Sequence, residues 1–214
     1  MKKLVTIFLT CLLLPLFANA DYISNSFFVV EKSMNFDKTI RSGKCSGVIP
    51  YPELSHSDEE LFGKINDEIH DFIEIYAICN KEKRNNFSVD FDIPESASKD
   101  FFSVRWLTKK DGNLWRIDVL NFNSESGNIL VPDNIFNLLS NHMMAKMVDL
   151  SEGHLPKKCS WEKLLDKIEA RDIQFYIKDR EWHIVFNAIP GINNVVDVKI
   201  PEYFLIGNRD HDRG

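Results

Sequence analysis

The feature that most constrains the fold is the segment DFFSVRWLTKKDGNLWRIDVLNF, Asp100 to Phe122, in which two strand-like runs flank Asp111-Gly112. Asp-Gly is a favoured two-residue turn between antiparallel strands, so the segment predicts a hairpin. Pairing outward from the turn puts three pairs on one face, the predicted core face: Thr108 with Trp115, Trp106 with Ile117, and Val104 with Val119. On the other face Arg105 falls opposite Asp118, an exposed ion pair that we interpret as fixing register, not as catalytic.

A second hairpin is predicted in DIQFYIKDREWHIVF, Asp172 to Phe186. A turn centred on Asp179-Arg180 brings the apolar residues onto one face; the pairs are Lys178 with Glu181, Ile177 with Trp182, Phe175 with Ile184, and Ile173 with Phe186. A four-residue loop on the same axis is the alternative, because Asp-Arg is a poorer turn than Asp-Gly. The strand Val195 to Ile200 then closes the sheet, since Pro201 cannot donate a ladder hydrogen bond.

Three segments have helical periodicity. Ser57 and Glu60 have capping-box spacing, and an apolar stripe follows them: Leu61, Ile65, Ile69, Phe72, Ile73 and Tyr76. The opposite, acidic face of this helix is interpreted as solvated surface. The segments PDNIFNLLSNHMMAKMVDL, with Pro132 in its first turn, and SWEKLLDKIEA predict two more helices. Hairpins with helices between them predict a single α+β domain: an antiparallel sheet with about three helices packed on it.

The first 20 residues, MKKLVTIFLTCLLLPLFANA, are typical of a signal peptide, with two lysines, an apolar run and an Ala-Asn-Ala cleavage site. We expect a periplasmic or secreted protein with a domain over residues 21–206, a polar tail at 207–214, and no membrane insertion after cleavage. Loss of Lys2 and Lys3 takes the formal net charge from -6 to -8 (−6 − 2). This charge argues against nucleic acid as a partner and mildly favours basic partners.

Three cysteines remain in the mature chain: Cys45, Cys79 and Cys159. An oxidising compartment favours one disulfide, and three cysteines allow three choices. We prefer Cys45–Cys79, which would tie a strand to the far end of the following helix. Cys159 is then either an idle thiol or the point of an intermolecular bond.

No sequence motif for hydrolysis, phosphate binding or dinucleotide binding occurs, so we predict no catalytic, cofactor or metal residues. His183, opposite Tyr176, is interpreted as half of a surface pair. The loop from Pro190 to Asn194 is interpreted mainly as a connection between the last two strands. It is also the candidate contact surface, through Pro190, Gly191, Asn193 and Asn194, because binding residues often lie on loops held by a rigid sheet.

The last strands carry a resemblance to a known family. WHIVFN, then AIPGI, then VDVKIPEY resembles the C-terminal signature of the RsiV-like extracytoplasmic domain. VIPYPEL, KINDEIHDF and SGNILVPDNIF fit the same pattern, so the resemblance covers roughly Val48 to Phe204. It implies a non-catalytic α+β domain like the ectodomain of a lysozyme-sensing anti-sigma factor, or like the accessory domain of a peptidoglycan deacetylase. We expect neither transmembrane signalling nor deacetylation here, and no binding residue is carried over.

The resulting hypothesis is an exported, non-enzymatic binding protein of the cell envelope, with a basic lysozyme-like protein or peptidoglycan as its partner. A small envelope hydrolase is the alternative, which a buried carboxylate pair, or His183 beside an acid, would favour. A structural role through Cys159 is the third hypothesis.

Overall fold

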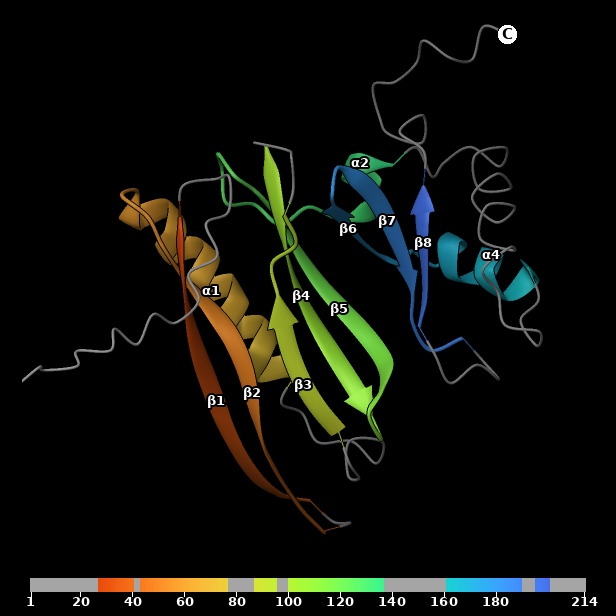
Figure 1. Cartoon of the computed structure of the whole chain (residues 1–214), viewed down its shortest axis with the longest axis horizontal. Coiled ribbons are helices and arrows are strands. Elements are labelled where there is room, and N and C mark those ends of the chain that lie inside the picture. The colour runs from red at the N-terminus through yellow and green to blue at the C-terminus, as the bar shows by residue number, and fades with distance from the viewer. Residues whose placement is uncertain are drawn as a thin grey trace, which may run out of the picture.

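The computed structural model describes residues 27–40, 43–76, 87–95, 100–136, 161–189 and 195–200. These residues form a mixed α+β fold with antiparallel sheets (Figure 1). The elements are β1 (Phe28–Ile40), β2 (Gly43–Ser55), α1 (Glu59–Tyr76), β3 (Phe87–Asp92), β4 (Phe101–Lys110), β5 (Asn113–Asn123), α2 (Pro132–Ile135), α4 (Trp161–Glu169), β6 (Gln174–Lys178), β7 (Glu181–Phe186) and β8 (Val196–Ile200). Within this part of the chain, no helix is both long and apolar enough to span a membrane.

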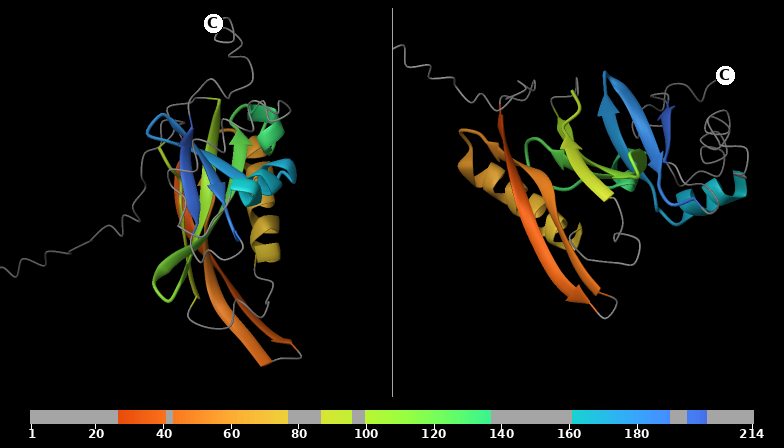
Figure 2. Two further views of the ribbon diagram at one scale, coloured as in Figure 1. Left: turned by 90° about the vertical axis from the view of Figure 1, so that its right-hand side faces the viewer. Right: turned by 60° about the horizontal axis from the view of Figure 1, so that its bottom comes forward.

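The strands follow chain order but divide into three sheets, β1-β2, β3-β4-β5 and β6-β7-β8, where a single sheet was expected. We call the second the middle sheet and the third the C-terminal sheet. Both α1 and α4 lie on the same side of the strands (Figure 2, left). The opposite side of the middle and C-terminal sheets is therefore free of these two helices.

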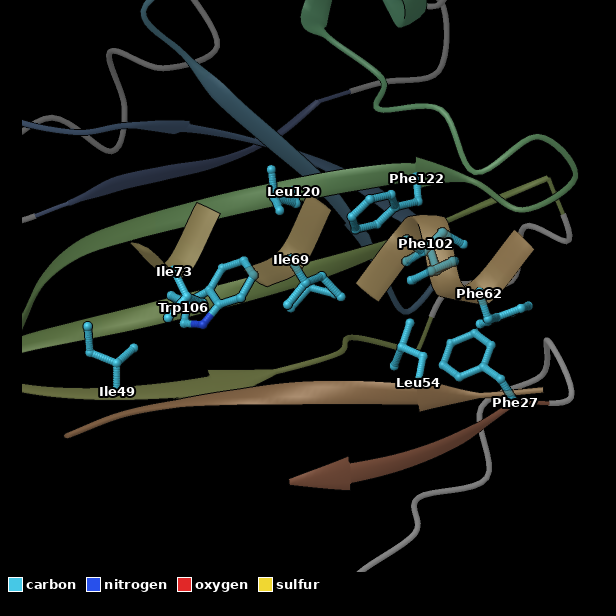
Figure 3. Close-up of a cluster of buried hydrophobic side chains, with 12 residues drawn as sticks. Phe27, Ile49, Leu54, Phe62, Ile69, Ile73, Phe102, Trp106, Leu120 and Phe122 are labelled. Carbon is cyan, nitrogen blue, oxygen red and sulfur yellow. The ribbon is translucent and has the colours of Figure 1, made fainter. Parts of the chain in front are cut away.

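Helix α1 fills the largest core. Asp58, not Ser57, is the N-cap, because its Oδ1 accepts a hydrogen bond from Leu61 N–H at 3.0 Å. Ile65, Ile69 and Ile73 of the predicted stripe are buried together with Phe62, and Leu61 and Phe72 are partly buried against them. Figure 3 shows this stripe packed among side chains of β2, β4 and β5; the buried cluster comprises Phe27, Ile49, Leu54, Phe62, Ile65, Ile69, Ile73, Phe102, Val104, Trp106, Leu120 and Phe122.

The loop after β5 is fitted closely to α1. Gly127 has a φ of +66°, and a Cβ at this position would lie 2.9 Å from Leu61 Cδ1. Only glycine combines that backbone conformation with so close an approach. Lys64 of α1 donates a 2.7 Å hydrogen bond to Asn128 Oδ1 in the same loop, so the loop and the helix hold each other.

The β4–β5 hairpin turns at the predicted dipeptide, but its register is wrong beyond the first two pairs. Asp111 and Gly112 have φ of 50° and 80°, as a type I′ turn requires. A bulge between Thr108 and Lys109 makes Trp115 an extra residue, so that Trp106 lies opposite Asp118. The predicted pairs are therefore shifted by one residue, and the expected Arg105–Asp118 cross-strand pair does not form.

The shift gives β5 two apolar faces. Leu120 and Phe122 join the core under α1, whereas Ile117 and Val119 pack against the C-terminal sheet. Because each side of a strand takes alternate residues, a one-residue slip exchanges the faces of every residue beyond it. Both faces of this hairpin are consequently buried in the middle of the molecule.

The β6–β7 hairpin confirms the predicted register, with Lys178 opposite Glu181, Ile177 opposite Trp182 and Phe175 opposite Ile184. Asp179 and Arg180 both have positive φ, 52° and 67°, so the two-residue turn is the one adopted. Strand β8 pairs with β7 and closes the sheet as predicted.

The C-terminal sheet and α4 share a second core. Leu164 and Ile168 of α4 are fully buried against residues of β6, β7 and β8. The predicted helix that starts at Pro132 ends at Ile135 in the structure, because Phe136 has an extended backbone and inserts its ring into this core. The rest of that predicted helix lies outside the described residues.

Candidate functional site

The most distinctive group of polar side chains lies where the helix-free faces of the middle and C-terminal sheets meet. A small apolar cluster joins the two faces, with Ile117 and Val119 from β5 against Tyr176 of β6 and Val185 of β7. Beside this cluster, five polar or aromatic side chains from five strands contact one another. We call them the polar network: Asp92, Arg105, Tyr176, His183 and Asp197.

Arg105 is the buried centre of the network and is only 7% exposed. Its Nε and Nη2 donate hydrogen bonds of 2.7 and 2.5 Å to the two carboxylate oxygens of Asp92 on β3. Such a two-bond contact fixes the plane of the guanidinium. Burial disfavours the charge of Arg105, but the hydrogen bond and the charge of Asp92 outweigh it and hold the pKa of Arg105 above its usual value.

The guanidinium lies over the ring of Tyr176, with Cζ 4.2 Å from the ring centroid. The imidazole of His183 stacks on the same ring at 4.7 Å and an interplanar angle of 11°. Two groups this close to one centroid need separate faces, so the phenol ring is held between Arg105 and His183. The contact carries both cation–π attraction and stacking across the joint between the sheets.

Asp197 on β8 completes the network by accepting two hydrogen bonds. The hydroxyl of Tyr176 donates to Oδ2 at 2.5 Å, and Nδ1 of His183 lies 3.0 Å from Oδ1. Burial, then the hydrogen bond to Asp197 and its negative charge, raise the pKa of Tyr176 above its usual value. The phenol therefore stays a neutral donor to the carboxylate at physiological pH.

The arrangement has one group with the geometry of a general base. When Asp197 accepts a proton-bearing Nδ1, the other ring nitrogen of His183 carries a lone pair. The His183 side chain as a whole is 19% exposed. The described contacts of His183 are structural partners, Asp197 and Tyr176.

Amide side chains bind the outer edge of β5, next to the network. The backbone N–H of Ile117 donates to Asn187 Oδ1 at 3.1 Å, and Asn187 Nδ2 donates back to the carbonyl of Ile117 at 2.5 Å. Gln174 Oε1 accepts the N–H of Val119, and Asn121 Nδ2 donates to the carbonyl of Phe175. The C-terminal sheet is thus attached through side chains where a backbone ladder would otherwise run.

The residues that the sequence singled out have different outcomes. Tyr176 and His183 are neighbours, as predicted. Arg105 bonds Asp92, and Asp118 bonds Arg116, so the predicted partner of each was wrong. The candidate contact loop, Pro190, Gly191, Asn193 and Asn194, lies outside the described residues. The same holds for the signal peptide, the polar tail, and the Cys79 partner of the predicted disulfide with Cys45; Cys45 itself lies in β2.

Sequence reasoning missed Asp92 and Asp197 as members of the network. Asp197 could have been found from the alternation of Val196, Val198 and Ile200, which places it on the polar face of the last strand. Among the described residues, no group of three or more His, Cys, Asp or Glu side chains has the arrangement of a metal site. Comparison of the sequence with protein-family models and with curated proteins finds no match. The resemblance to the RsiV-like domain therefore stays a prediction.

Proposed function

We propose that the protein is an exported, non-enzymatic binding protein of the cell envelope whose partner is a basic, lysozyme-like protein. The observation that carries this proposal is the exposed face of α1. Six of its acidic side chains are exposed: Asp58, Glu59, Glu60, Asp67, Asp71 and Glu74. Lys64 is the only lysine or arginine of the helix, so its single positive charge is outnumbered by these acids.

Several features support this proposal. The signal-peptide-like N-terminus favours export, and the resemblance to the RsiV-like domain favours a non-catalytic role beside the cell wall. An acidic helix face steers a basic protein during association and sets its orientation. The side-chain bonds between the middle and C-terminal sheets support the further proposal that residues 21–206 act as a single domain.

The test is a titration of residues 21–214 with a basic lysozyme at low and at physiological salt. The variant neutralises three exposed acids from the middle to the last turn of α1: Asp67→Asn, Asp71→Asn and Glu74→Gln. None lies in the first turn, where negative charge stabilises the helix, and Glu74 lies in the last turn, where it opposes the helix dipole. We expect wild-type binding to survive physiological salt and the variant to bind roughly tenfold more weakly, about 1.4 kcal/mol.

The matched control removes the same charge away from α1, with Glu31→Gln, Glu95→Gln and Glu169→Gln at exposed sites. An equal loss of affinity in both variants would show that binding is a non-specific attraction between the net charges of the two proteins, which would contradict the proposal. Binding that disappears at physiological salt would contradict the proposal as well.

A small envelope hydrolase is a second candidate, favoured by one observation, the 3.0 Å contact between His183 Nδ1 and Asp197 Oδ1. In such an enzyme His183 would take a proton from water as it attacks the substrate. Incubation with purified peptidoglycan, followed by chromatography of the released fragments, tests this candidate. The hydrolase candidate would be supported if His183→Gln lowers the rate of hydrolysis at least about 100-fold. The control at an exposed site, His70→Gln, should keep the wild-type rate. No release by wild type would exclude it for this substrate.

A further inference from the structure

The hairpin end of the middle sheet carries an aromatic cluster that belongs to none of the three buried cores. Phe87, the first residue of β3, packs against Trp115, with the ring centroids 5.1 Å apart and an interplanar angle of 67°. Lys110 lies with Nζ 5.7 Å from the centroid of Phe87, and Leu114 is 38% exposed. We call these four residues the aromatic end. β3 begins there and β4 ends there (Figure 1).

The bulge in β5 is what brings Trp115 to this cluster. Lys109 pairs with Leu114, and the next pair is Thr108 with Arg116, so Trp115 is the extra residue between them. A bulge costs a ladder position and turns a side chain away from the regular alternation. Here the redirected side chain is a half-buried tryptophan packed on a half-buried phenylalanine. Half-exposed aromatic rings of this kind are more frequent at binding sites than elsewhere on protein surfaces.

The local charge is opposite to that of the whole chain. Residues 109–116 contain Lys109, Lys110 and Arg116 against one acid, Asp111, a balance of +2 (3 − 1), whereas the full chain carries -6. Arg116 is held by Asp118. Lys110, which lies over the Phe87 ring, and Lys109, its neighbour on the opposite face of β4, are both exposed cations at this end of the sheet. A ligand that fits this end has apolar surface for the rings and negative charge for the lysines.

We propose that the aromatic end binds a carboxylate-bearing N-acetylated glycan, the chemistry of a peptidoglycan strand. Sugar rings present C–H groups whose partial positive charge is attracted to the faces of Trp115 and Phe87. The carboxylates of the glycan pair with Lys109 and Lys110, and the amide of Asn113, which lies opposite Lys110, is placed to bond an acetamido group. This inference supplies a wall-binding surface, separate from α1, for the envelope binding protein proposed above, and it rests on that protein being exported.

The charge pattern favours this occupant over two others. A basic protein would be repelled by the lysines, and it has the acidic face of α1 as its complementary surface. A purely apolar peptide would leave the two lysines without partners and gain only a small contact area. Single-stranded nucleic acid also stacks on aromatic rings beside cations, so it is included as an outcome of the test.

The experiment is a calorimetric titration of residues 21–214 with three soluble probes: muropeptides, neutral N-acetylglucosamine oligomers and poly-glutamate. We expect muropeptides to bind most tightly, the neutral oligomers more weakly, and poly-glutamate not measurably. Trp115→Leu keeps an apolar side chain but removes the ring, and should weaken muropeptide binding roughly tenfold. Phe28→Leu, at an aromatic residue that is 59% exposed on β1, is the matched control and should bind as wild type does.

The combination Lys109→Ala with Lys110→Ala should remove the preference for muropeptides over neutral oligomers and leave the binding of neutral oligomers intact. Lys163→Ala with Lys178→Ala is the control for charge alone. Equal binding of poly-glutamate or of single-stranded DNA, or unchanged affinity in Trp115→Leu, would overturn the proposal. Trp115→Leu should still bind lysozyme, and the α1 variant should still bind muropeptides, so failure of one proposal is distinguishable from failure of the other.

Discussion

Two asparagines solve the same problem in this protein, each by pairing its side-chain amide with the backbone of one strand residue. Asn66 of α1 accepts from Leu54 N–H and donates to the Leu54 carbonyl, both at 2.8 Å. Asn187 does the same for Ile117. A carboxamide offers one donor and one acceptor with the spacing of a peptide group, so it replaces a missing neighbouring strand. Asparagine is required because an unsatisfied buried backbone group costs about 1–3 kcal/mol.

Asn187→Leu tests this role. The leucine keeps the volume but leaves the buried N–H and carbonyl of Ile117 without their amide partner. We expect the free energy of unfolding, measured by urea denaturation, to fall by about 2–4 kcal/mol. Asn113→Leu is the control: the exposed side chain of Asn113 bonds the nearby Asp111 carbonyl at 3.4 Å, so its loss should cost less than about 0.5 kcal/mol. A small effect at Asn187 would show that water replaces the amide.

At the scale of the elements, the sequence predicted where both hairpins turn but the register of only one. In β6–β7 most of the apolar residues lie on one face, and the two-residue turn without a bulge fixes the register that pairs them. In β4–β5 both faces are buried, so hydrophobic alternation accepts either register. The bulge at Trp115 decides between them by placing Phe122 under α1 and Val119 against the C-terminal sheet. The register of β4–β5 therefore depends on residues that are distant in sequence, and the local sequence pattern of the hairpin contains no information about them.

The helix predicted from Pro132 begins there but is interrupted at Phe136 for a related reason. Its helical propensity is real in the first turn, where Asn134 Oδ1 accepts the N–H of Val131 at 2.9 Å. Phe136 then leaves the helical conformation and packs its ring edge-on against Phe175 at 5.1 Å. Burial of a phenylalanine ring contributes about 1.5–3 kcal/mol, which exceeds the propensity of one residue. Tertiary packing therefore sets the end of this helix.

For the whole molecule, the polar network illustrates how far sequence reasoning extends. The pairing of Tyr176 with His183 follows from one hairpin and was predicted. Asp197 reaches that pair through β8 of the same sheet, whereas Arg105 reaches it only because the middle and C-terminal sheets meet along their helix-free faces. No local sequence pattern encodes the contact between two sheets, so only the Tyr176–His183 part of the site could be predicted. Its members join the sheets without a backbone ladder, which makes the joint depend on the protonation of side chains.

Tyr176→Phe should therefore change how stability depends on alkaline pH. The unfolded phenol has a pKa of about 10, and burial beside Asp197 raises the folded value above it. The folded state thus holds this proton more firmly than the unfolded state. The contribution of this proton to the free energy of unfolding is complete below pH ~10. It is lost as pH rises toward the folded pKa, with a slope of about 1.4 kcal/mol per pH unit.

In Tyr176→Phe that slope is absent, while the lost hydrogen bond to Asp197 lowers the free energy of unfolding at neutral pH by about 1 kcal/mol. Urea denaturation of both proteins at intervals from neutral pH into the alkaline range measures the gap between them. We expect a constant gap below pH ~10 that narrows above it, because only the wild type loses stability through this phenol. Differences between the two proteins remove the effect of the lysines, which titrate in the same range. A difference in stability that stays constant at all pH values would mean that Tyr176 has the same pKa in the folded and unfolded states. Solvent would then reach the joint between the sheets.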